Sequence, residues 1–347
     1  MGELRMDMTG IPENISGTYR IECTLGAGGS GVVYKAWHSR LHKYVVIKED
    51  MLSPLIDMEA RRSEVEALKN IRSMYVPQVF DFLTDGDRSF TVIEYVEGVS
   101  FDKLLVSGRG IAGHRLAKLY WQLASALKSI HRRNVCHRDI KPSNIMLTPE
   151  GDVYLIDFNS ALVEGNSARL FSRSPGYASP EQYELFSRLE RAAESRSEPD
   201  AVKNRDDGVE TILLESDCVT EQIADDVAYR RAYPDMPFQV PDSEPQRETQ
   251  VCIDWKRSDI YSLGATMYHL LTGKRPTERA GAGETMDGLD RSGGGIGRII
   301  ERSMRRDPSE RFSSAGELAG AIRDLRHNDP RQTTRQTHTS NPQDLTA

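Results

Sequence analysis

The sequence predicts an α+β protein, with an antiparallel β-sheet in its first third and helices in most of the rest. Residues 19–38 alternate apolar and polar side chains on either side of a glycine cluster, as the strands of a hairpin do. Residues 114–132 and 257–273 instead repeat apolar side chains at helical spacing. Strands grouped ahead of helices are typical of the α+β class.

Composition limits the class of protein further. The 347 residues can bury a sizeable core, and the net charge of -7 gives no reason to expect a nucleic-acid partner. No run of eighteen apolar residues indicates a membrane span, and the 4 cysteines show no C-x-x-C pairing, which favours a reducing, cytoplasmic setting. We expect residues 1–17 to be a flexible leader and 327–347 a disordered tail.

The glycine cluster has the spacing of a phosphate-binding loop. Gly26, Gly28 and Gly31 follow G-x-G-x-x-G, which dinucleotide-binding folds also use. A dinucleotide fingerprint opens a helix, whereas Val32 and Val33 here continue a strand. Glycines in such a turn let the backbone approach phosphates closely. A plain hairpin without a ligand is the alternative.

The stretch 136–159, CHRDIKPSNIMLTPEGDVYLIDFN, carries the groups that phosphoryl transfer requires. Asp139 can accept the proton of a hydroxyl, and Lys141 can reach the transferred phosphate. Asn144 and Asp157 offer the hard oxygens that Mg²⁺ prefers. Strands over 145–147 and 153–156 predict a hairpin that brings Asn144 and Asp157 together at its ends.

HRDIKPSN followed by DFN resembles the catalytic and metal-binding loops of the eukaryotic-type (Hanks-type) protein kinases, in a bacterial-like form, and Lys141 resembles the Ser/Thr branch. The resemblance implies a two-lobed kinase domain over about 18–326. A sheet-based N-lobe would cover about 18–94 and a mainly helical C-lobe about 99–326, with ATP in the cleft between them.

The resemblance also implies the nucleotide contacts. Lys48, at the end of YVVIK, would hold the α- and β-phosphates, and Glu64 would orient it, with Glu59 as the competing candidate. Residues 94–98 resemble the hinge between lobes, with Ile93 as gatekeeper. The implied nucleotide-binding residues are Gly26, Gly28, Gly31, Val33, Val46, Lys48, Glu94, Val96 and Met146.

The same resemblance assigns the chemistry. Asp139 would position a Ser or Thr hydroxyl and accept its proton, and Lys141 would stabilise charge on the γ-phosphoryl group. Asn144 and Asp157 would bind Mg²⁺, or Mn²⁺ in its place. Supporting positions are Ser174 beside Asp139 and Lys141, Asp259 under the catalytic-loop backbone, and Arg311 paired with Glu181 of the ASPE ending.

We therefore expect a Ser/Thr protein kinase that transfers the ATP γ-phosphoryl group to proteins and to itself. A pseudokinase acting as a nucleotide-binding scaffold and a small-molecule phosphotransferase are the alternatives. Asn159 stands where the family has glycine, and asparagine is the non-glycine residue most tolerant of positive φ.

The activation segment suggests regulation by a phosphate. Arg138 precedes Asp139, so a phosphate on Ser172, or on Ser167, would find a guanidinium partner. Ordering without modification is the alternative.

An acidic insertion over about 185–250 holds 16 acidic and 8 basic side chains, where the resemblance leads one to expect a short connection. Leu185, Phe186, Leu189 and Ala193 extend the preceding helix, and a second helix is predicted over 206–231. We expect the insertion to dock a basic partner or to restrain the activation segment. A solvated insertion without function is the alternative.

Overall fold

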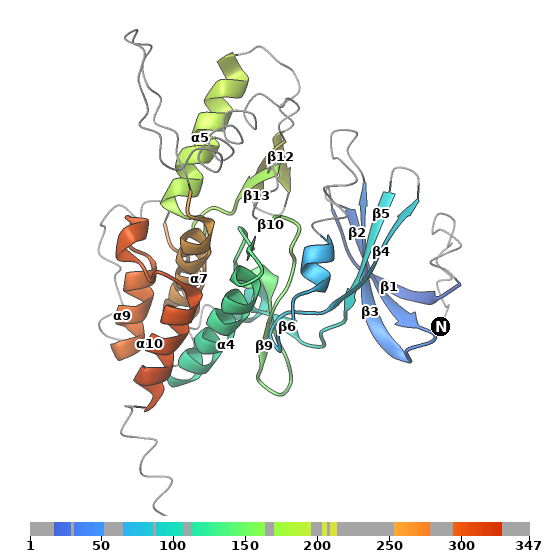
Figure 1. Ribbon diagram of the computed structural model, residues 1–347, viewed down its shortest axis with the longest axis horizontal. Helices are drawn as coiled ribbons and strands as arrows, with labels where there is room; N and C mark the ends of the chain where they lie inside the picture. The colour runs from blue at the N-terminus through green and yellow to red at the C-terminus, as the bar shows by residue number, and fades with distance from the viewer. Residues whose placement is uncertain are drawn as a thin grey trace, which may run out of the picture.

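The computed structural model describes residues 17–28, 31–51, 65–85, 88–106, 111, 113–163, 170–195, 203–206, 209–213, 253–277 and 294–327. A five-stranded sheet forms one end of the molecule and a group of helices the other (Figure 1). No helix in these ranges is long and apolar enough to cross a membrane.

The five-stranded sheet is antiparallel throughout, in the order β1-β2-β3-β5-β4. Its apolar face buries a small core that includes Ala36, Val45, Ile47, Phe90 and Val92. Alternation along β3 explains this face, because Val45 and Ile47 point inward while Val46 and Lys48 point to the other side. The strands are β1 (Tyr19–Gly28), β2 (Gly31–His38), β3 (Lys43–Met51), β4 (Val79–Asp85) and β5 (Arg88–Glu94).

A small sheet lies between the two ends of the molecule (Figure 1). β6 (Val99–Ser100) pairs with β8 (Ile145–Leu147), which pairs with β9 (Val153–Leu155). The helix α3 (Phe101–Leu105) follows β6 and buries Phe101 completely. Residues 95–98 therefore join the large sheet to the small one, as expected of a hinge.

The helical part is built around α7 (Trp255–Thr272). Asp254 caps its first turn by accepting a hydrogen bond from Arg257 N, and Gly273 ends it with φ 71°. Buried residues face in every direction around α7, so this helix has no solvent-exposed side. It packs against α4 (Gly113–His131) and α9 (Gly294–Ser303), and α10 (Ala315–His327) packs against both of these helices.

Shorter elements complete the described chain. β7 (Val135–Cys136) pairs with β10 (Leu162–Val163), and 3-10 helices span Pro142–Asn144 (η1) and Pro308–Glu310 (η3). α5 (Pro180–Ser195) begins in the ASPE sequence and buries Phe186 and Leu189, as the apolar spacing predicted.

The insertion differs from expectation after α5. β12 (Lys203–Asp206) and β13 (Val209–Leu213) form a hairpin beside β11 (Leu170–Arg173), in the order β11-β13-β12. The helix predicted over 206–231 is therefore wrong at Asp206 and over Val209–Leu213, and residues 207–208 and 214–231 lie outside the described chain. The charges at the two ends suggested a helix, but the β-branched residues of VETI favour a strand.

Gly31 occupies a backbone conformation that only glycine adopts easily, which gives a test of the first hairpin. Its φ is 130°, and a Cβ there would lie 1.9 Å from the carbonyl oxygen of Glu49 in the paired strand β3. Gly31→Ala should lower the free energy of unfolding by more than about 1–3 kcal/mol, the cost of one strained residue. Denaturant unfolding measures this.

Gly26→Ala is the matched control, because no heavy atom lies within 4 Å of the added Cβ. This variant should change the free energy of unfolding by less than about 0.5 kcal/mol. Equal effects at the two positions would contradict the strand geometry.

Candidate active site

The carboxylate of Asp139, in the catalytic loop, is held by the side chains of Ser174, Lys141 and Asn144. Ser174 Oγ donates to its Oδ1 at 2.6 Å, and Lys141 Nζ lies 2.9 Å from its Oδ2. Lys141 Nζ also donates to Ser174 Oγ at 3.2 Å, which closes a triangle. Both carboxylate oxygens of Asp139 therefore have partners, and the predicted contacts of Ser174 with Asp139 and Lys141 are confirmed.

Asn144 ties the loop to the hairpin. Its Nδ2 donates to the backbone oxygen of Asp139 at 2.8 Å and to Oδ2 at 3.2 Å. At the other end of the hairpin, Ile156 N donates to Asn144 O at 2.9 Å. Asn144 and the segment that leads into Asp157 are thus adjacent, as the hairpin predicted, although β9 ends one residue earlier than expected.

Asp157 connects this hairpin to the large sheet. Lys48 Nζ, from β3, lies 2.5 Å from Asp157 Oδ1. Burial alone would raise the pKa of Asp157, but the Lys48 ammonium and its hydrogen bond, with smaller contributions from His137 and Lys141, hold that pKa below its ordinary value. The side chain is 34% exposed, so a carboxylate oxygen can still reach a ligand.

The Asp157 backbone has φ 66°, in the left-handed region. Asn159 is absent from the described non-glycine residues with positive φ, which are His42, Asn134, Arg138 and Asp157. Asn159 therefore does not use the tolerance of asparagine for positive φ, and the unusual conformation lies two residues earlier, at Asp157. Asn159 needs no special tolerance at this position.

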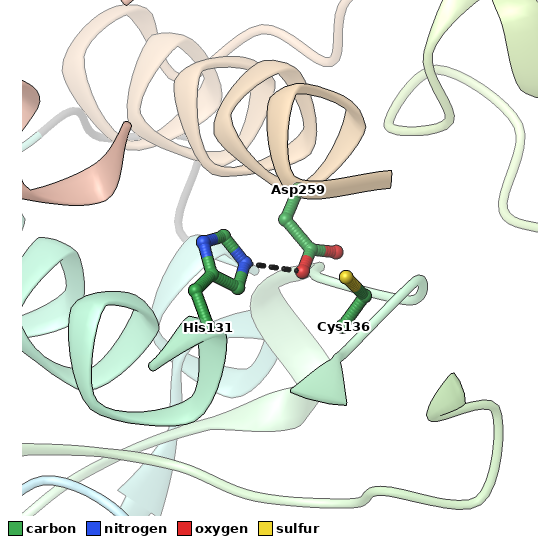
Figure 2. Close-up of side chains that lie close together, drawn as sticks. All are labelled: His131, Cys136 and Asp259. Carbon is green, nitrogen blue, oxygen red and sulfur yellow. Dashed lines mark hydrogen bonds and ion pairs between the residues drawn. The ribbon is translucent and has the colours of Figure 1, made fainter. Parts of the chain in front are cut away.

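Asp259 fixes the backbone ahead of Asp139. Its Oδ2 accepts from His137 N at 2.8 Å and its Oδ1 from Arg138 N at 2.8 Å, while His131 Nε2 lies 2.9 Å from Oδ2. Figure 2 shows His131 and Asp259 pointing toward each other with Cys136 beside them. This confirms the predicted role of Asp259 in the loop backbone.

His131, Cys136 and Asp259 also have the residue types of a metal site, and their ligand atoms lie within 4.8 Å of one another. Asp259 is fully buried and its oxygens already accept three hydrogen bonds, which a metal would have to displace. Burial, and next the Asp259 carboxylate, raise the pKa of the Cys136 thiol far above its ordinary value, which opposes the thiolate form. The group is better explained as a structural clamp.

The residues predicted at the nucleotide lie in five strands, β1, β2, β3, β5 and β8, and in the segment that follows β5. Val33 in β2 lies opposite Lys48 in β3, and Val46 lies opposite Ile93 in β5. Met146 is in β8, across from Ser100. The Glu94 carboxylate accepts from Gln78 N at 3.1 Å, so its side chain serves the β4–β5 junction. Gly26 has open space where a Cβ would stand, and Val96 is half-buried.

Two predicted groups cannot be placed. Glu64 and its competitor Glu59 lie outside the described residues, so their pairing with Lys48 remains a prediction. Ser167 also lies outside them, whereas Ser172 is in β11.

Arg311 and Glu181 form the predicted ion pair. Arg311 Nη1 and Nη2 bind the two oxygens of Glu181 at 2.6 and 2.8 Å, with the Arg311 side chain fully buried. Arg311 also donates to the backbone oxygens of Arg257, Arg305 and Arg306. The start of α5 is therefore anchored to α7 and to the chain after α9.

Sequence reasoning missed two further contacts of the catalytic loop. Gln182 Nε2 donates to Arg138 O at 3.0 Å, and the Arg138 guanidinium lies 4.6 Å from the ring centre of Trp255. Gln182 follows the ASPE sequence directly, which could have indicated it. Trp255 comes after the insertion and carries no such signal.

The Lys48–Asp157 pair predicts a change in titration. Lys48→Met should raise the pKa of Asp157, because burial then acts without its main opposing charge. In the wild type, the lowered pKa means that Asp157 stabilises the fold above its unfolded-state pKa of about 4, and that this is lost as the pH falls through the folded-state value. Carboxyl ¹³C NMR titration measures the shift.

Lys48→Arg is the control, since it keeps the positive charge and should leave the pKa of Asp157 low. If the pKa of Asp157 in Lys48→Met is no higher than in the wild type, the lowered pKa is not caused by Lys48.

Comparison with known proteins agrees with this geometry. Residues 19–191 match the protein kinase domain. Relatives include a protein named "Probable serine/threonine-protein kinase" from Clostridium acetobutylicum, 31% identical over 175 residues. A protein of the same description from Streptomyces coelicolor is 32% identical over 184 residues. The carbon catabolite-derepressing protein kinase of Saccharomyces cerevisiae is 29% identical over 170 residues.

These alignments cover 48–49% of this chain but only 27% of each relative. The chain thus spans well under a third of the length of the relatives. The matched segment contains the glycine loop, Lys48, the catalytic loop and Asp157. With its antiparallel sheet, helical second part and these motifs, the segment over residues 19–191 belongs to the protein kinase family, and its relatives are named as Ser/Thr kinases.

Proposed function

We propose that this chain is an ATP-dependent protein-serine/threonine kinase that phosphorylates protein hydroxyls, including its own. The carrying observation is the closed set of contacts among Asp139, Lys141 and Ser174, linked through Asn144 to Asp157 and Lys48. A carboxylate, two cations and two hard-oxygen ligands within one network are what positioning and charge neutralisation of a phosphoryl group require.

Lys48 is the proposed ligand of the α- and β-phosphates, with Glu64 orienting it. Asn144 and Asp157 are the proposed ligands of Mg²⁺, or of Mn²⁺ in its place. The donor set fits such an ion, because an amide oxygen and a partly exposed carboxylate are hard ligands. When bound, the ion would neutralise charge on the phosphates. Gly26, Gly28, Gly31, Val33, Val46, Glu94, Val96 and Met146 are the proposed nucleotide neighbours.

Asp139 is the proposed acceptor of the hydroxyl proton. The hydrogen bond from Ser174 and the contact with Lys141 orient its carboxylate, so little rearrangement is needed when a substrate hydroxyl arrives. Lys141 then lies beside the position of the incoming hydroxyl, where its charge can oppose that of the γ-phosphoryl group.

The kinase domain in this proposal extends over about 18–326 and includes the insertion, in a cytoplasmic protein. The charge of the insertion, with 16 acidic and 8 basic side chains over residues 185–250, favours a basic protein partner.

The direct test is transfer of labelled phosphate from Mg-ATP to the protein itself and to a generic basic protein. Asp139→Asn should lower the rate by about a hundredfold or more, the usual contribution of a positioned acid or base. Nucleotide binding should remain, because Lys48 and Asp157 are unchanged.

Asp152→Asn is the matched control, since Asp152 contacts Lys118 and Gln122 and lies away from the network. Its rate should equal that of the wild type. If the wild type binds nucleotide but transfers no phosphate, the pseudokinase alternative replaces this proposal.

A further inference from the structure

The activation segment and the insertion share one sheet. β11 pairs along its whole length with β13, from Leu170 opposite Leu213 to Arg173 opposite Glu210. β12 pairs with the far side of β13. Figure 1 shows β12 and β13 beside the chain that leads to α5. Three strands make a more stable unit than an isolated hairpin, so the insertion completes a sheet that β11 cannot form alone.

The hairpin is encoded locally. Asp206 pairs with Val209, and the two residues between them in the sequence are Asp207 and Gly208. Asp-Gly is among the pairs that two-residue hairpin loops favour. The strand partner of β11 is therefore a feature of this sequence and needs no second molecule.

β11 leads directly to the catalytic carboxylate. The next residue, Ser174, donates to Asp139 at 2.6 Å, and its backbone oxygen accepts from Tyr177 N and Ala178 N at 3.0 Å. Ser174 is 4% exposed, so its side chain is buried within this turn. The placement of β11 therefore decides where the Ser174 hydroxyl lies.

α5 holds β11 through side chains. The Arg173 guanidinium lies 4.2 Å from the ring centre of Phe186 and 5.2 Å from that of Tyr183. Tyr183 Oη accepts from Gly176 N at 2.8 Å. Phe186 belongs to the part of α5 that lies in the insertion, so the insertion contacts the activation segment twice, through α5 and through β13.

Arg138 is poorly placed to order this segment through a phosphate. It is 4% exposed, its guanidinium stacks on Trp255, and its carbonyl is bound by Gln182. Its guanidinium is thus already engaged inside the protein. Backbone pairing to β13, which needs no modification, is already made.

We propose that the β12–β13 hairpin is a built-in positioning element of the kinase: by pairing with β11 it keeps Ser174 against Asp139 and sets the turnover number without phosphorylation of the activation segment. This rests on the proposed kinase activity and names the regulation of the same site.

Thr211→Pro tests the pairing, because Thr211 lies in the central strand opposite both Ser172 and Asn204, and proline removes a backbone donor there. Amide hydrogen exchange of residues 170–173 should become faster. The kcat on a protein substrate should fall about tenfold or more, the effect of losing one or two net hydrogen bonds, while KM for ATP stays unchanged. Thr211→Ala keeps the backbone and should match the wild type in both measurements.

Wild-type protein freed of phosphate in residues 160–177, checked by mass spectrometry, should keep its kcat. A tenfold loss on dephosphorylation, or equal kcat for the Pro and Ala variants, overturns the proposal. If Thr211→Pro fails to fold, exchange in the wild type decides. The alternate β11 amides that face β13 should be protected to the same extent as the amides of residues 209–213, and a lack of protection at all four β11 residues overturns the proposal. Protected amides in a wild type that transfers no phosphate would reject the kinase assignment and leave the strand pairing intact.

Discussion

The buried carboxylate of Asp259 is the constraint on which the catalytic loop depends. An unpaired charge at this depth would be very costly, so its oxygens must be satisfied by donors that stay in place. Two of those donors are the successive backbone N–H groups of His137 and Arg138, and the third is the imidazole of His131. Because Asp259 belongs to the buried helix α7, these hydrogen bonds attach the catalytic loop to the helical core.

From that anchor the remaining site is reached by short steps. Arg138 takes a positive φ of 67°, which turns the chain so that Asp139 meets Ser174 and Lys141. Asn144 then links Asp139 to the hairpin by a hydrogen bond, and Asp157 links the hairpin to Lys48 of the sheet by an ion pair. The Lys48–Asp157 ion pair thus joins the large sheet to the catalytic hairpin.

Much of this could be predicted because the informative residues are close in sequence. The hairpin over 145–155 follows from alternation and a turn, and it places Asn144 near Asp157 without knowledge of the rest of the fold. Contacts between distant segments were predicted only where a family motif supplied both partners, as for Arg311 with Glu181. No such motif indicated the stacking of Arg138 on Trp255 or the pairing of β13 with β11. The helix predicted from residue 206 onward relied on the charges at its two ends. The β-branched residues of Val209–Leu213 favour a strand instead, and a strand forms there.

The Arg311–Glu181 pair has a consequence for where this protein can be divided. The recognisable kinase segment ends at residue 191, yet Arg311, Trp255 and Asp259 all come later in the chain. Leaving a charge such as Glu181 without its buried partner costs about 3–5 kcal/mol, a large share of the stability of an ordinary domain. The segment that carries the chemistry is therefore not an autonomous module. The match to the kinase family ends at residue 191, but the contacts that stabilise the matched segment extend to Arg311.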